Sequence, residues 1–240
     1  MKALTFIVIT LLSGTLAGTV LGLVNQGIVE PYISAAIDLE NQAAAADGEI
    51  IDPAEFTAYR IWQRSGSIAA GAVLGMSLGA LFGVVFAYGR NLLPGSTNLK
   101  KALVLAGIMW LALYFVPAIK YPANPPAVGD PETIYLRQGL YVAIIAVSGF
   151  AALGLGVAYK KMPAGSRKFI APAIYAAVVA AAFFALPANP DEITAPMDLV
   201  DSFRMATGAT MTLFWVLLGA ILGALWDRTK PHEAARIKAL

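Results

Sequence analysis

The chain alternates between long apolar runs and short polar segments. Six runs contain no Lys, Arg, Asp, Glu or His: residues 3–29, 65–89, 102–119, 138–159, 169–190 and 205–226. About 20 apolar residues carry a helix across the hydrocarbon core of a bilayer. The pattern therefore predicts an all-α integral membrane protein with six transmembrane helices, forming one polytopic membrane domain over residues 1–240. The expected helices cover residues 4–29, 65–89, 101–119, 135–159, 168–186 and 203–226.

The first run could be a secretory signal, because Lys2 precedes it. A signal has an apolar region of about 7–15 residues followed by a cleavage site, whereas this run continues to Val29. We therefore expect a retained helix. Residues 30–64 are expected to form one or two short helices outside the bilayer, with Asp52-Pro53 as a helix start. The six helices then read as three hairpins.

Charge is distributed unevenly between the connecting segments. If the N-terminus lies inside the cell, most of the 17 basic residues fall in inner segments and nearly all of the 15 acidic residues fall in outer loops. The positive-inside rule then places both termini in the cytoplasm.

The composition also excludes several kinds of chemistry. The chain is 58% hydrophobic and 13% charged, with a mean hydropathy of +0.69 and no cysteine. Disulfides, thiolate metal sites and cysteine nucleophiles are therefore ruled out, and the one histidine, His232, is in the C-terminal tail. No nucleotide-binding loop occurs and no ionisable group lies within the six runs. We expect neither an enzyme, nor a tightly bound cofactor, nor a nucleic-acid partner.

Glycines at a spacing of four residues mark the first two helices. Gly14, Gly18 and Gly22 share one face of the first, and four more repeat along the second. The latter are Gly71, Gly75, Gly79 and Gly83. Such a stripe is typical of close helix packing; the alternative is that the glycines line a pore.

A four-residue sequence occurs twice and indicates a weak internal repeat. Residues 122–125 and 187–190 both read Pro-Ala-Asn-Pro, and each copy ends an apolar run. Acidic residues follow each copy, and then an arginine opens the next run, Arg137 or Arg204. Arg64 opens the second helix in the same way. A cation at a helix N-terminus opposes the helix dipole, so these arginines are expected to form ion pairs with outer-loop acids; the alternative is that they are interface anchors.

The two repeated loops also carry the chain's best candidate ligands for a metal ion. Carboxylate and amide oxygens suit hard or borderline divalent cations. The candidate residues are Asn124, Asp130, Glu132, Asn189, Asp191, Glu192, Asp198 and Asp201. The alternative is a solvated acidic face or a set of arginine partners. If they do form a cation-attracting mouth, neutralising Asp191 and Glu192 lowers uptake without lowering expression.

The loop motifs resemble those of the CbtA family. One stretch runs from Lys120 through Pro-Ala-Asn-Pro-Pro-Ala-Val-Gly-Asp-Pro-Glu-Thr to Arg137-Gln138. The other runs from Leu186 through Asp191-Glu192 and Asp198 to Phe203-Arg204, and continues into the helix with Trp215, Gly219 and Gly223. The resemblance covers most of the chain.

This resemblance implies a probable cobalt transporter subunit in the cytoplasmic membrane of a prokaryote. It further implies a small one-helix partner, CbtB, that carries a histidine motif, and a cobalt ion as the substrate, taken up for corrinoid cofactors. The alternative function is a structural or assembly subunit of a larger membrane complex, without a ligand of its own. Homo- and hetero-oligomers both remain open.

Overall fold

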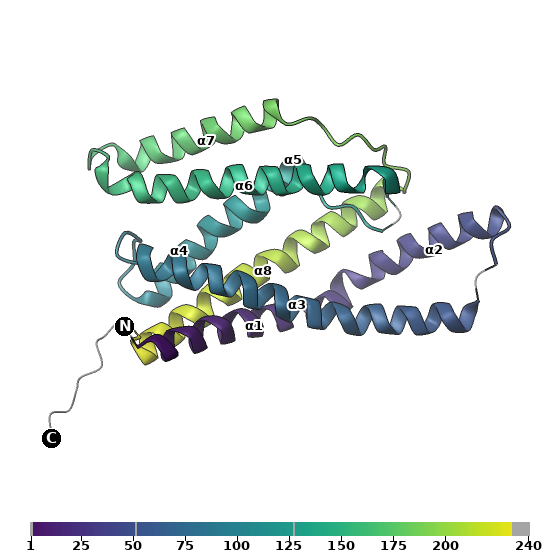
Figure 1. The fold of residues 1–240 in the computed structure, drawn as a ribbon, viewed down its shortest axis with the longest axis horizontal. Coiled ribbons are helices and arrows are strands. Elements are labelled where there is room, and N and C mark those ends of the chain that lie inside the picture. The colour runs from purple at the N-terminus through teal and green to yellow at the C-terminus, as the bar shows by residue number, and fades with distance from the viewer. Residues whose placement is uncertain (1, 51, 127, 232–240) are drawn as a thin grey trace, which may run out of the picture. The chain divides into compact units, whose positions relative to one another are not determined.

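The computed structural model describes residues 2–50, 52–126 and 128–231. His232, the basic tail and Ala127 of the first loop motif lie outside this part. Every regular element among the described residues is a helix, and six segments are long and apolar enough to cross a membrane (Figure 1). The predicted all-α membrane fold is therefore confirmed.

The helices are bounded as follows. They are α1 (Ala3–Ile28), α2 (Glu30–Ala46), α3 (Pro53–Gly89), α4 (Asn98–Trp110), η1 (Leu111–Phe115), α5 (Val116–Lys120), η2 (Pro131–Thr133), α6 (Ile134–Ala158), η3 (Tyr159–Lys161), α7 (Arg167–Ala185) and α8 (Met197–Thr229). The chain divides into two compact units. Unit 1 comprises Met1–Pro31, Ala43–Gly107 and Gly208–Leu240, and unit 2 comprises Tyr32–Gln42 and Ile108–Thr207. The single-domain organisation stays a prediction.

The second spanning helix begins twelve residues earlier than expected. Asp52 caps α3 by accepting hydrogen bonds from the backbone N–H groups of Ala54 (2.8 Å) and Glu55 (3.4 Å). No proline or loop segment follows before the apolar run, so the helix continues without a break through 37 residues. At about 1.5 Å per residue this is roughly 55 Å, far more than a bilayer core requires. The expected outer helix at residue 53 is thus the first part of the spanning helix, and only α2 is separate.

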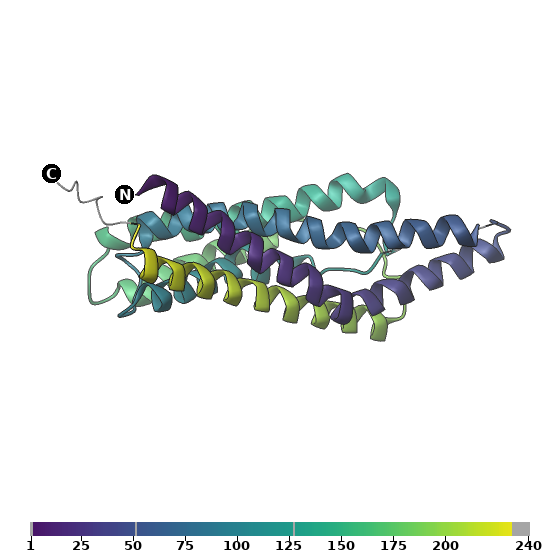
Figure 2. The same ribbon diagram turned by 90° about the horizontal axis from the view of Figure 1, so that it is seen from below.

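The glycines of unit 1 lie at the interface between α1 and α3, which run side by side in both views (Figures 1 and 2). A Cβ on Gly75 would lie 2.6 Å from Gly18 Cα, and one on Gly79 would lie 2.7 Å from Gly14 Cα. Gly71 and Gly83 are also buried on this face. The two backbones therefore approach so closely that neither helix has room for a side chain there.

A second close contact in unit 1 joins α8 to α4. A Cβ on Gly223 would lie 2.6 Å from Leu99 Cα. One turn later, Asp227 accepts hydrogen bonds from the backbone N–H groups of Asn98 (3.1 Å) and Leu99 (3.0 Å). A carboxylate at a helix N-terminus is favourable both as a cap and for the helix dipole. Asp227 therefore holds the start of α4 against the end of α8.

Glu30, a buried acid, forms an ion-pair cluster with two arginines in unit 1. Its side chain is 10% exposed and contacts both Arg60 and Arg64, the latter with Nε 2.9 Å from Oε1. Arg64, which the sequence singles out for ion pairing, is thus placed beside an acid, although that acid sits at the junction of α1 and α2. Gln26 on α1 donates to the hydroxyl of Ser67 on α3 at 2.8 Å. Polar contacts therefore continue the glycine interface to the end of the span.

Unit 2 is organised around α6, which packs against η1 and α5 as well as against α7. Its core contains Val116, Ile144 and Ala182. The π-helix η1 ends two residues before Pro117. Proline has no backbone N–H, and in an α-helix its ring clashes with the carbonyl four residues earlier. A wider π turn relieves that clash, and the N–H of Val116 accordingly donates to Leu111 O. The proline thus explains why the third span is irregular at this level.

Candidate functional site

The two Pro-Ala-Asn-Pro loops meet at one end of unit 2. Tyr121, just before the first loop, donates its hydroxyl hydrogen to Pro187 O in the second loop at 2.6 Å. Burial raises the pKa of the Tyr121 phenol, which further favours the protonated form that donates this bond. Lys120 donates to Phe183 O at 2.8 Å, where a cation also suits the C-terminal end of the α7 dipole. These contacts join the last turns of α5 and α7.

Arg137 near the start of α6 pairs with an acid of the other loop. Its Nε lies 2.9 Å from Asp191 Oδ2, with side chains 26% and 6% exposed respectively. Its Nη2 donates to Asp130 O at 3.0 Å, and its Nη1 lies 3.5 Å from Val128 O. The guanidinium thus binds the carboxylate of the second loop and the backbone of the first.

Asp191 is held by further donors from the first loop. The Thr133 hydroxyl lies 2.8 Å from its Oδ2, and the backbone N–H of Asp130 donates to the same oxygen at 3.0 Å. Gly129 makes this approach possible: its φ is +104°, and a Cβ there would lie 2.5 Å from Asp191 Oδ2 and 2.7 Å from Arg137 Nη1. An L-residue with a side chain is strained at such a φ, and no space is left for it.

Arg204 at the start of the last span makes the reciprocal contact. Its Nη2 donates to Asn124 Oδ1 at 2.8 Å and its Nε donates to Ala123 O at 3.1 Å, both in the first loop. Asp201, one turn earlier on α8, lies 3.5 Å away and is 60% exposed, so it contributes little. Each repeated loop therefore binds the arginine that follows the other loop.

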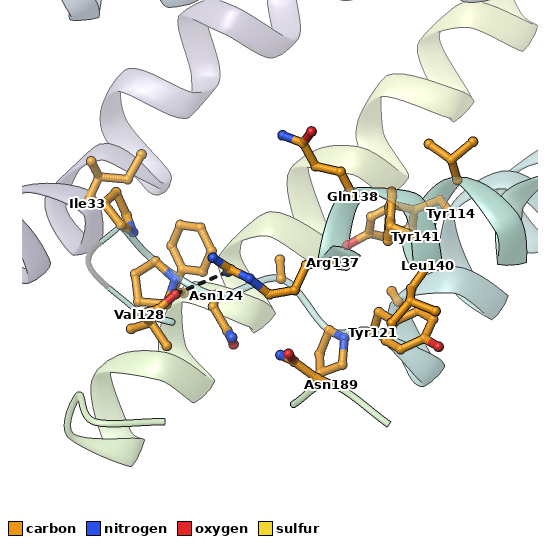
Figure 3. Close-up of a pocket in the computed structure, with 17 residues that line it drawn as sticks. Ile33, Tyr114, Tyr121, Asn124, Val128, Arg137, Gln138, Leu140, Tyr141 and Asn189 are labelled. Carbon is orange, nitrogen blue, oxygen red and sulfur yellow. Dashed lines mark hydrogen bonds between the residues drawn. The ribbon is translucent and has the colours of Figure 1, made fainter. Parts of the chain in front are cut away.

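Beside these contacts lies a pocket of about 810 Å³, all of whose lining residues belong to unit 2 (Figure 3). Its walls are mostly proline, aromatic and aliphatic. Its polar lining residues are Tyr114, Tyr121, Asn124, Arg137, Gln138, Tyr141 and Asn189. Tyr114 comes from η1 and Tyr141 from α6, so the π turn caused by Pro117 forms part of the wall.

The predicted metal ligands do not form one cluster. Asn124 and Asp191 are bound to arginines, Asn189 accepts from the backbone N–H of Asp191 at 3.2 Å, and Asp130 caps η2 by accepting from Glu132 N at 2.8 Å. The remaining acids are exposed: Glu132, Glu192, Asp198 and Asp201. No group of three or more His, Cys, Asp or Glu able to hold a metal ion occurs among the described residues. A metal site on these residues stays a prediction.

The structure adds residues that the sequence reasoning missed. Thr133, Tyr121 and Glu30 take part in the polar contacts, and Tyr114 and Tyr141 line the pocket. Pro117 is the one signal in the sequence that could have drawn attention to Tyr114, since a proline within a span disturbs the preceding turn.

Comparison with known proteins gives one match. The model of the family described as "Probable cobalt transporter subunit (CbtA)" matches residues 3–227. No curated protein matches, and no solved structure matches.

Proposed function

The chain belongs to the CbtA family of probable cobalt transporter subunits, and on that premise we propose that it is the membrane subunit of a cobalt uptake system in the cytoplasmic membrane of a prokaryote. The observation that carries the proposal is the extent of the match, from the first residue of α1 to the last turn of α8. The family is one of transporter subunits, and the six spanning segments provide the membrane body that such a subunit needs.

A small one-helix partner subunit completes the proposed system. The six apolar runs contain no Lys, Arg, Asp, Glu or His and the sequence has no nucleotide-binding loop, so this chain carries no evident energy-coupling group. A partner with histidines would supply the nitrogen ligands that this chain lacks. The asymmetry of basic residues favours cytoplasmic termini, which would place the Pro-Ala-Asn-Pro loops on the outer side, where the ion arrives.

Exposed acids near these loops would attract the cation without binding it tightly. Glu132, Glu192 and Asp198 are exposed and contact no arginine within hydrogen-bond distance in the described part of the chain. Like charges at the rim of a concave surface raise the local concentration of counter-ions. We assign to them capture of the substrate ion, and to Asp191 and Asn124 the support of the loops.

The alternative function, an assembly subunit, loses its main argument. It rests on glycine faces that are free to dock other helices, but Gly14, Gly18, Gly75 and Gly79 pack against one another within unit 1.

Accumulation of radioactive cobalt tests the proposal. Cells lacking their own uptake system would express this chain alone, the one-helix partner alone, or both, at matched membrane levels. Accumulation with both subunits that exceeds either alone supports the proposal. Equal accumulation in all three strains and in cells with an empty vector contradicts it.

A further inference from the structure

The pocket in unit 2 has walls that suit an organic molecule better than a bare metal ion. Its volume of about 810 Å³ lies within the usual range of about 300–1,000 Å³ for small-molecule sites. None of the described residues that line it is Asp or Glu. A divalent ion that lost its water there would meet no negative ligand, and burying an unpaired charge is very costly.

In the part of the chain that the structure describes, the two loop asparagines each have a free amide N–H group. Arg204 and the backbone N–H of Asp191 can only donate, so the oxygens of Asn124 and Asn189 are fixed as their acceptors, at 2.8 and 3.2 Å. The two Nδ2 groups have no hydrogen-bond partner among the described residues. Each amide oxygen is already engaged by one donor, so the groups that the asparagines can offer a ligand freely are their N–H donors.

Arg137 adds no acceptor to the pocket, and each of its three nitrogens already has a partner: Nε contacts Asp191 and Thr133, Nη2 contacts Asp130 O, and Nη1 contacts Val128 O. Figure 3 shows the contact with Val128. The hydroxyls of Tyr114 and Tyr141 and the amide of Gln138, which also line the pocket, can both donate and accept. A hydrated cation presents the hydrogens of its water shell and needs acceptors around it. The described lining residues offer that shell no carboxylate, whereas the free N–H groups of the asparagines suit carbonyl or carboxylate oxygens.

We propose that this pocket binds cobalt as an organic chelate whose outer surface carries carbonyl or carboxylate oxygens, and not as the hydrated ion. The inference rests on the proposed function for the identity of the metal. The pocket itself is argued from its size, its apolar walls and the fixed orientation of Asn124 and Asn189. The exposed acids lie outside the lining and attract charge without selecting the form of the metal.

Exchange-inert cobalt complexes test this form directly. Purified full-length protein in detergent micelles is titrated calorimetrically with two of them. Tris(glycinato)cobalt(III) is uncharged and carries outward carbonyl oxygens, whereas hexaamminecobalt(III) is cationic and presents only N–H groups, like a hydrated ion. Co²⁺ alone is the third probe. The exposed acids favour the cationic probes, so they cannot account for a preference for the uncharged complex.

Asn124→Asp is the matched variant. The new carboxylate keeps an acceptor for Arg204 but replaces the Nδ2 donor by a second acceptor, at almost the same size. We expect it to weaken tris(glycinato)cobalt(III) binding by about tenfold or more, the effect of one lost hydrogen bond plus an unfavourable acceptor pair. Gln42→Glu makes the same chemical change on α2, outside the lining, and should leave binding unchanged.

Tighter binding of tris(glycinato)cobalt(III) than of the other two probes, lost in Asn124→Asp and kept in Gln42→Glu, supports the inference. Tighter binding of hexaamminecobalt(III) or Co²⁺, no binding of any probe, or equal effects of the two variants overturns it. These measurements need no transport, so failure here is distinct from failure of the proposed uptake, which the cell assay reports by itself.

Discussion

Two adjacent acids, Asp191 and Glu192, should respond in opposite ways to neutralisation. The Asp191 side chain is 6% exposed and its oxygens meet Arg137, Thr133 and the N–H of Asp130 at 2.8–3.0 Å. Glu192 is exposed. From the sequence alone, Asp191 and Glu192 form one acidic patch, and neutralising both is expected to lower cobalt uptake but not expression. The contacts of Asp191 instead lead us to expect that its loss destabilises the fold.

The expected loss of stability follows from which polar groups lose their partner in each variant. Asp191→Ala leaves the partly buried guanidinium of Arg137 without its carboxylate and the N–H of Asp130 without its acceptor, and breaking a buried ion pair costs about 3–5 kcal/mol. The 26% exposure of Arg137 lets water compensate in part, so we expect the lower end of that range. Asp191→Asn keeps one acceptor oxygen, and the loss should be about 1–3 kcal/mol. Glu192→Gln should stay within about 0.5 kcal/mol of the unchanged protein.

The free energy of unfolding is measured by titrating the purified protein in micelles with sodium dodecyl sulfate and following its circular dichroism. Combining Asp191→Ala with Arg137→Met completes a double-mutant cycle, and the pair should be coupled by about 0.5–3 kcal/mol. If Asp191→Ala and Glu192→Gln unfold at the same detergent fraction, or if the cycle shows no coupling, the pair does not hold the loops together.

Three further predictions concern the glycines and the orientation. Gly129→Ala should lower the free energy of unfolding in the same titration by about 1–3 kcal/mol because of its positive φ and the oxygen 2.5 Å from the new Cβ, whereas Gly139→Ala, with nothing within 4 Å, should not; equal stability of the two variants contradicts the loop geometry. Gly75→Leu should prevent normal assembly on native gels, because even one carbon would lie 2.6 Å from Gly18 Cα, while Gly27→Leu has open space and should assemble; two normally assembled variants refute the α1–α3 packing. A reporter fused after Leu240 should be cytoplasmic, and an extracytoplasmic signal would reverse the orientation.

The spans could be predicted because the membrane imposes a simple rule. A helix must remain apolar for about 20 residues, and six runs obey that rule without interruption. Helix ends outside the bilayer follow a weaker rule. Nothing in residues 53–64 stops a helix, so α3 extends outward from its span, and periodicity alone cannot separate one long helix from two joined end to end.

The partners of the charged groups are harder to predict, because a sequence shows which residues are adjacent in the chain but not which distant residues meet in the fold. Arg137 was expected to pair with an outer-loop acid, and Asp130 and Glu132 are the nearest along the chain. Asp130 is instead occupied as the cap of η2, where it accepts from Glu132 N at 2.8 Å. The guanidinium of Arg137 donates a hydrogen bond to the carbonyl oxygen of Asp130 and forms its ion pair with Asp191 beside the other loop.

The repeat itself accounts for this exchange. Each loop ends one span and precedes an arginine, so two copies on the same side offer two arginines and two sets of acceptors. Arg137 binds Asp191 of the second copy, and Arg204 binds Asn124 and Ala123 of the first. Pairing within each copy would leave two independent loops, whereas reciprocal pairing makes each loop depend on the other. Of the two asparagine oxygens, that of Asn124 is engaged by this exchange and that of Asn189 by the N–H of Asp191 in its own loop, so the free N–H groups at the pocket follow from how the two loops are stabilised.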